Sequence, residues 1–434
     1  MINGGGNNNR KNNLPQSKSQ YNKNNKKPPD IKYTKSASSS VSDDLPENEY
    51  YTDIAHKFKL AKLFTVVFLI LFIIASVILN PKELGADNLK YLLRYINIQG
   101  SNKSAASEFY IDLDETSSIC YYKNNIAVLR KNRLDIYDMN GRTNFTSSLV
   151  YSNPVAKASD RYIITYDLGM NKMAVFNSFS MVYEYKGDTP IYYAQVTNKG
   201  NVVYVSSEKG YQSAVYVLDS GFKEKFKCSL EKDYVVGADI NNEASKLAIA
   251  GFYAQNGDYL GRVILYNTNY KEPVKKIEVA GEQPYGVKLN DNGVFAVFEN
   301  SFRVYDISGG EISDYDFMYR KIHAMALTPK LASVVLSEKT LGANDRILIF
   351  DSGGNILYDQ IIDAQIINIK FSEDYKFLYF LTRAGLYRVN IEQKIFELAA
   401  ASGEYDETTD SIVYANDRNI YLSGLLKINA VAVK

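Results

Sequence analysis

The sequence contains no tryptophan, two cysteines and two histidines among its 434 residues. Cys120 and Cys228 are far apart and form no C-x-x-C pattern, which argues against a disulfide framework or a zinc site. We therefore expect both thiols to be free. The G-x-S-x-G nucleophile turn of serine hydrolases is also absent from the sequence.

A strong charge of either sign is missing as well, because the net charge is only +1. This balance gives no indication of a nucleic-acid partner or of a strongly acidic one. It hides an asymmetry, since residues 1–62 carry +5 and the remainder carries −4. Tyrosine, by contrast, occurs 36 times, and it favours a β-rich fold.

The N-terminal part of the chain divides into a polar tail and an apolar segment. Residues 1–55 are rich in Asn, Lys, Ser and Gly, so we predict a disordered tail. The segment from Leu63 to Leu79 has no charge and would span roughly 26 Å as a helix. We predict a transmembrane helix over residues 60–80, with Phe68 and Phe72 also in contact with lipid.

Three lysines precede this segment and predict its orientation. Lys57, Lys59 and Lys62 lie at its N-terminal edge, whereas charges beyond it roughly balance. The positive-inside rule then places the N-terminus in the cytoplasm and residues 80–434 outside the plasma membrane. A cleaved signal peptide fits less well, because more than fifty residues precede the apolar run.

Residues 81–107 are expected to form a stalk. Apolar residues between Asp87 and Ile98 have helical spacing, and the polar stretch from Ser101 to Ser107 reads as a linker. The stalk would separate the membrane anchor from a domain over residues 108–434.

A repeated pattern of short strands and turns fills residues 108–434. Each unit has apolar strands, a polar hairpin turn and a third strand that ends on Asp or Asn. These closing residues are 39 to 48 positions apart, as expected for a β-propeller, and are Asp138, Asn177, Asp219, Asn267, Asp306, Asp351 and Asn390. Their side chains can accept hydrogen bonds from the backbone two residues on, so we interpret them as turn residues and not as catalytic ones.

The number of blades follows from eight hairpin turns. The last unit, from Ser411 to Lys434, lacks a fourth strand, and an extra strand at Phe109–Leu113 precedes the first complete unit. We predict that this strand completes the last blade and closes the ring. The expected fold is all-β, with eight four-stranded blades, and seven blades are the alternative.

The layout resembles an uncharacterised domain-of-unknown-function family of Gram-positive bacteria, within the WD40-like and quinoprotein-like propellers. The apolar anchor, the segment from Asn88 to Tyr95 and the strand-turn-strand units carry this resemblance. It implies single-pass membrane proteins with an extracytoplasmic propeller. It implies no activity and no functional residues.

Several enzyme classes can be set aside from the sequence. Quinone-cofactor dehydrogenases repeat a tryptophan-bearing docking motif, which this chain cannot form. His323 is the one histidine beyond the apolar segment, and its alternating context indicates a packing or channel-lining residue. We therefore predict no enzyme, and no catalytic, cofactor-binding or metal-binding residues.

Tyrosines at strand ends and in loops suggest a binding surface. They include Tyr121, Tyr192 and Tyr285, although the sequence does not say which of them line a face. The longest insertion, residues 251–261, is the predicted recognition loop, with the aromatic residues Phe252, Tyr253 and Tyr259.

The sequence thus predicts a non-catalytic interaction or sensing module at the cell envelope. Its expected partners are the lipid bilayer, envelope or membrane proteins, and the cell-wall polymer. The alternative is a carbohydrate-binding or enzymatic propeller with its site in the central channel. Ionisable groups gathered at one mouth of the channel would favour this alternative, and an apolar or tyrosine-rich patch would favour a scaffold.

Overall fold

The computed structural model describes residues 49–79, 108–111, 117–255, 257–337, 344–416, 418–425 and 427–433. It separates into two units, one with the N-terminal helix and one with the β domain. Each unit is described by itself. The predicted tail up to residue 48 and the stalk over residues 81–107 lie outside the described residues.

The helix α1 (Glu49–Leu79) includes the whole apolar segment and eleven residues before Leu60. Within it, residues 56–75 are long and apolar enough to cross a membrane. Leu63, Phe68 and Phe72 are exposed along the helix, and Leu79 is its last residue. Thr65, a polar residue of the segment, donates its hydroxyl to the carbonyl of Ala61 at 2.9 Å, which satisfies it inside the helix.

The β domain consists of eight four-stranded antiparallel sheets, as predicted. Blades 1 to 4 contain the strands β2 (Ser118–Tyr122), β3 (Asn125–Leu129), β4 (Arg133–Asp138), β5 (Thr143–Ser148); β6 (Pro154–Ala158), β7 (Ile163–Asp167), β8 (Lys172–Phe176), β9 (Met181–Lys186); β10 (Ile191–Val196), β11 (Val202–Glu208), β12 (Tyr211–Leu218), β13 (Glu224–Leu230); and β14 (Tyr234–Ile240), β15 (Lys246–Gln255), β16 (Asp258–Asn267), β17 (Pro273–Ala280).

Blades 5 to 8 repeat this order. They contain β18 (Pro284–Leu289), β19 (Gly293–Phe298), β20 (Ser301–Asp306), β21 (Glu311–Asp316); β22 (Ile322–Leu327), β23 (Ala332–Ser337), β24 (Asp345–Phe350), β25 (Ile356–Ile362); β26 (Ile366–Phe371), β27 (Phe377–Thr382), β28 (Gly385–Asn390), β29 (Ile395–Ala401), then the 3-10 turn η1 (Ser402–Glu404); and β30 (Ser411–Ala415), β31 (Asn419–Ser423), β32 (Lys427–Ala432).

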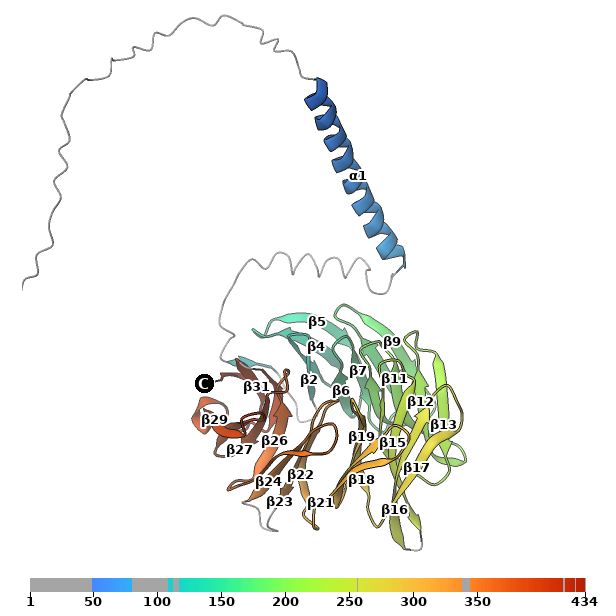
Figure 1. Cartoon of the computed structure of the whole chain (residues 1–434), viewed down its shortest axis with the longest axis vertical. Helices are drawn as coiled ribbons and strands as arrows, with labels where there is room; N and C mark the ends of the chain where they lie inside the picture. Colours follow the sequence, from blue (N-terminus) through green and yellow to red (C-terminus); the bar gives the residue numbers. More distant parts are fainter. Residues whose placement is uncertain are drawn as a thin grey trace, which may run out of the picture. The chain divides into compact units, whose positions relative to one another are not determined.

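The predicted ring closure is confirmed by the last blade. Its outer strand is β1 (Glu108–Tyr110), which pairs with β32 so that Phe109 lies opposite Ile428. The inner strand β30 packs beside β2, which joins blade 8 to blade 1. Figure 1 shows the sheets following one another around the ring, from β2 to the C-terminal strands. The first and last parts of the domain are thereby held together.

The hydrophobic core is divided among the blade interfaces. Each of eight clusters of buried side chains combines residues from two neighbouring blades. The cluster across the closure brings Ile126 and Val128 of blade 1 against Tyr421 and Ile428 of blade 8. A single sheet would leave both of its faces exposed to water. Radial stacking of the blades buries these faces against each other.

The Asp and Asn residues that close the third strands act as turn residues, as predicted. Asp138 accepts hydrogen bonds from the backbone N–H groups of Asn140 and Arg142, at 2.8 and 2.9 Å. Asp351 makes the same pair of bonds with Gly353 and Asn355. The side chain therefore satisfies the tight turn into the outer strand.

Candidate functional site

The central channel contains a cavity of about 950 Å³. Residues of all eight blades line it, mostly the last residues of the inner strands and the turns that follow them. We call this the polar end of the channel. The other end, where the inner strands begin, is called the aromatic end.

The polar end has a ring of structurally equivalent positions, one in each blade. In every blade this residue lies one position before the last paired residue of the inner strand, opposite the second paired residue of the next strand. The channel ring, in blade order, is Tyr121, Lys157, Gln195, Asp239, Lys288, Ala326, Lys370 and Tyr414.

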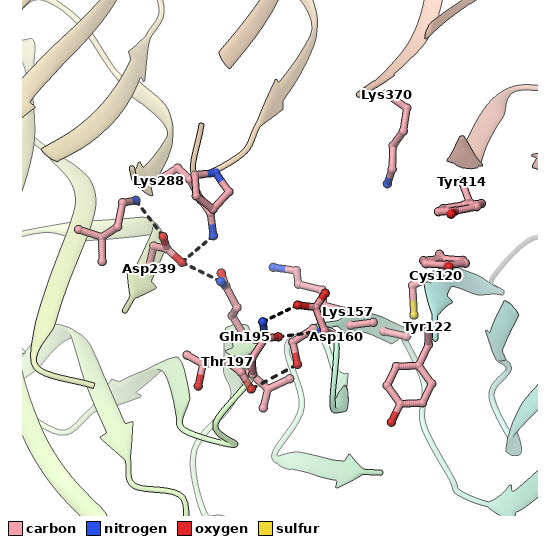
Figure 2. Close-up of a pocket in the computed structure, with 18 of the residues that line it drawn as sticks. Cys120, Tyr122, Lys157, Asp160, Gln195, Thr197, Asp239, Lys288, Lys370 and Tyr414 are labelled. Carbon is pink, nitrogen blue, oxygen red and sulfur yellow. Dashed lines mark hydrogen bonds and ion pairs between the residues drawn. The ribbon is translucent and has the colours of Figure 1, made fainter. Parts of the chain in front are cut away.

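Asp239 organises one side of the ring. Its buried carboxylate accepts hydrogen bonds from Gln195 Nε2 at 2.7 Å and from the backbone N–H of Leu289 at 2.8 Å. It also pairs with Lys288 Nζ at 3.0 Å. Figure 2 shows these contacts converging on Asp239 from the blades on either side of its own. Three donors compensate the loss of water around the buried charge.

Lys157 lies next to this network without joining it. Its ammonium group is 3.5 Å from the centroid of the Tyr193 ring, a cation–π contact. Desolvation, followed by repulsion from Lys288, lowers the pKa of Lys157 from 10.5 to about 8, although Asp239 opposes the shift. Lys157 is thus a partly buried lysine without a carboxylate of its own, and it loses its proton at a lower pH than an ordinary lysine.

Lys370 occupies the opposite side of the ring, close to the Cys120 thiol. Desolvation by the channel walls lowers the pKa of the Lys370 ammonium group. The half-buried Cys120 is desolvated too, which raises its thiol pKa to about 12 in spite of the nearby lysine. Cys120 is therefore protonated at neutral pH and is a poor nucleophile.

Two tyrosines fill the ring between these lysines. Tyr121 and Tyr414 stack with their ring centroids 3.7 Å apart and their planes 9° from parallel. The Tyr414 hydroxyl also donates to the Glu373 carboxylate. The two stacked rings form the wall of the cavity where blade 8 meets blade 1.

The aromatic end is shaped by a repeated β-bulge. In six of the eight inner strands one residue near the start is skipped by the ladder with the next strand. Bulges re-aim side chains, and the skipped residues Tyr192, Val236 and Tyr285 are exposed. Met325 of the neighbouring blade is exposed as well, and a Cβ on Gly286 would lie only 3.2 Å from its Cε. Glycine at this position therefore allows blades 5 and 6 to approach closely.

The predicted recognition loop adds to this end through two of its three aromatic residues. Tyr234 begins β14 opposite Phe252, and their rings stack with centroids 5.7 Å apart. Phe252 in turn meets Tyr259 edge-on at 5.8 Å. Tyr253 is separate, because its ring lies under the Arg262 guanidinium at 4.5 Å. We call Tyr192, Tyr234, Phe252, Tyr259, Tyr285 and Met325 the aromatic face.

The remaining candidates lie apart from the cavity. His323 is the skipped residue of the β22 bulge, and its Nδ1 lies 3.1 Å from the buried carboxylate of Asp345. Cys228 is a buried residue of the outer strand β13, and both cysteines are free, as predicted. Among the described residues, no cluster of three His, Cys, Asp or Glu side chains could hold a metal ion.

Sequence reasoning did not identify the channel ring, although a signal for it exists. Lys157, Lys288 and Lys370 each interrupt an apolar strand two residues before a hairpin turn. Aligning the strands on their turns would have placed these charges at one level of the channel.

The β domain is similar to solved β-propellers. The C-terminal WD40 domain of Sif2 has a TM-score of 0.54 and 12% identity, over 77% of this chain and 100% of that one. Sqt1 from Chaetomium thermophilum has a TM-score of 0.51 and 10% identity, over 77% and 100%. BamB from Moraxella catarrhalis has a TM-score of 0.46 and 11% identity, over 76% and 99%. At these identities the likeness to Sif2 and Sqt1 shows the fold alone.

Curated proteins gave no match to this sequence. One family does match, a family of unknown function designated DUF5711, over residues 99–423. This range covers most of the chain and runs from blade 1 into the strands of blade 8. The chain therefore belongs to the DUF5711 family.

Proposed function

We propose that the protein is a single-pass membrane protein that presents its propeller outside the plasma membrane as a non-catalytic protein-interaction module. The apolar segment of α1 and the lysines that precede it in the same helix support the anchor and its orientation. The likeness to a WD40 domain supports the fold of an interaction module and no particular partner.

The aromatic face is the observation that carries this proposal. It extends over four consecutive blades, from Tyr192 in blade 3 to Met325 in blade 6, and five of its six side chains are exposed. Tyrosine and methionine are enriched at protein interfaces, where an apolar body is buried and a hydroxyl can still find a partner. Exposed apolar groups gathered at one end of a domain mark an interaction site.

The second candidate, a ligand-binding or enzymatic channel, is favoured by the polar cavity. From the sequence, ionisable groups at one channel mouth would favour an enzymatic or carbohydrate-binding propeller, and a tyrosine-rich patch would favour a scaffold. The domain has both features, ionisable groups at the polar end and aromatic groups at the aromatic end. The protonated Cys120 thiol and the fully engaged Asp239 favour binding over chemistry in that cavity. We accordingly assign protein binding to the aromatic face.

Site-specific photo-crosslinking in intact cells tests the assignment. A photoreactive phenylalanine analogue replaces Tyr285 in one variant and Asn198, which lines the polar cavity, in the other. The proposal predicts a discrete protein adduct from position 285 and none from position 198. Equal adducts at both positions, or adducts at position 198 alone, would contradict it.

Protease protection on the same cells tests the topology. The propeller, residues 108–434, should become accessible to external protease only if it lies outside, while an epitope on the N-terminal tail remains protected. Digestion of the tail with a shielded propeller would reverse the proposed orientation.

A further inference from the structure

The channel ring contains more positive than negative charge. It has three lysines and one carboxylate, Asp239, which is already engaged by Lys288. Across the part of the chain that the structure describes, neither Lys157 nor Lys370 has an Asp or Glu oxygen within the 4.0 Å of an ion pair. The ring therefore has an excess of two positive charges.

Such an excess is unfavourable for the fold unless something compensates for it. Removing an ammonium group from bulk water without a partner costs free energy. The lowered pKa values of Lys157 and Lys370 report this cost. Perturbed ionisable groups that converge in a cavity are characteristic of functional sites.

Acidic side chains at the rim of the cavity do not cancel the excess. Asp160 and Asp291 are on the hairpin turns, further out than the ring, and both are exposed to solvent. Glu243, also exposed, pairs with Lys199 at 3.0 Å. These carboxylates lie on turns beyond the ends of the inner strands, whereas Lys157 and Lys370 are on the strands themselves. At that distance they compensate the two ammonium groups less than a direct partner would.

The two lysines lie on either side of the tyrosine stack. Lys370 is in blade 7 and Lys157 is in blade 2, with Tyr414 and Tyr121 on the two blades between them. Figure 2 shows both amino groups projecting into the open space of the cavity. Its volume of about 950 Å³ is in the range of small-molecule sites.

We propose that the polar end of the channel binds a phosphate group, with Lys157 and Lys370 as its cationic residues. A phosphate monoester carries about −1.5 to −2 charges at neutral pH, which matches the excess of the ring. Lysine ammonium groups bind phosphate oxygens as point charges and need no fixed bidentate geometry. This site is separate from the aromatic face and does not depend on the partner proposed there.

Calorimetric titration of the full chain in detergent tests the proposal, with inorganic phosphate and glycerol 3-phosphate as probes. The ring variant combines Lys157→Gln with Lys370→Gln. The matched control combines Lys209→Gln with Lys232→Gln, which removes the same charge from two exposed lysines outside the cavity. Thermal unfolding of each variant confirms that the propeller remains folded.

The expected result is binding by the wild type and by the control, with an affinity at least about tenfold weaker in the ring variant. Preference for inorganic phosphate would identify a free ion as the ligand, and preference for glycerol 3-phosphate would identify an ester; both support the site. No binding of either probe to the wild type, or equal loss in the control, would overturn the proposal.

The pH dependence gives a second readout. Lys157 faces Tyr193, Tyr166, Lys288 and Asp239. Because its pKa is about 8, phosphate binding should weaken as the pH rises above 8 and this ammonium group loses its proton. In the Lys157→Gln variant this transition should be weaker, because only Lys370, whose pKa is also lowered, still loses a proton there. An unchanged pH profile in that variant would contradict the role of Lys157.

Discussion

At the polar end of the channel, polar side chains from neighbouring blades meet around the buried carboxylate of Asp239. At the aromatic end, a few residues earlier on the same inner strands, tyrosine, valine and methionine are exposed to solvent. The strands are equivalent in fold, so the difference comes from single positions within each repeat. The propeller thus has two chemically distinct ends, and the residues of each can be substituted without changing those of the other.

Substitution of Asp239, at the polar end, should have the largest effect on stability. Asp239→Asn removes the charge that Lys288 and Gln195 share and leaves Lys288 unpaired in the channel. The free energy of unfolding should fall by about 2–4 kcal/mol, as expected for the loss of one partner of a buried pair. Chemical denaturation measures this change. A cost near zero would show that the network does not support the fold.

Substitutions in the aromatic face should weaken partner binding and leave folding unchanged. Replacing Tyr234 and Phe252 with alanine removes the stacked centre of the aromatic face. We expect partner binding to weaken by about 2 kcal/mol or more, because aromatic anchors dominate interface energies. Affinity for the partner identified by crosslinking measures this loss. Tyr253→Ala, on the same strand but outside the face, is the matched control and should bind normally.

Removing the charge of Lys157 should stabilise the fold. Lys157→Met eliminates the desolvated ammonium group but also its contact with Tyr193, so we expect a net gain of about 1–2 kcal/mol at pH 7. Thermal and chemical unfolding at pH 7 measure this gain.

The gain should depend on pH. Below pH 8 Lys157 is charged in both the folded and the unfolded state, and the full penalty is present. Between pH 8 and its ordinary value of 10.5 the folded state releases the proton first, so the wild type gains stability relative to the variant. A stability difference that is independent of pH would contradict this account.

The smallest effect is expected at the rim. Glu243→Gln breaks an ion pair with Lys199 in which both side chains are more than half exposed. Exposed pairs of this kind contribute little to stability. The variant should therefore unfold like the wild type, in contrast with Asp239→Asn. A comparable destabilisation would remove the distinction between the ring and its rim.

Much of the fold follows from the sequence because it repeats. Hairpin turns and closing Asp or Asn residues recur at each blade, so eight blades and the closing strand at Phe109 could be counted from them. The channel ring could not be read in the same way. Lys157, Asp239 and Lys370 stand alone in separate strands, and their convergence depends on how the blades are placed around the axis.

The aromatic face shows a second limit of the sequence. The residues Phe252 and Tyr259 could be selected from the length of their loop, but their contact with Tyr234 depends on the pairing of β14 with β15. The β-bulges that expose Tyr192 and Tyr285 are properties of hydrogen-bond register. Residue type alone does not determine that register.

A reciprocal binding measurement tests the central claim that the channel has two independent sites. Phosphate affinity and partner affinity are measured on the ring variant, Lys157→Gln with Lys370→Gln, and on the aromatic variant, Tyr234→Ala with Phe252→Ala. We predict that the ring variant loses phosphate and keeps the partner, whereas the aromatic variant loses the partner and keeps phosphate. Loss of both ligands in either folded variant would contradict the claim.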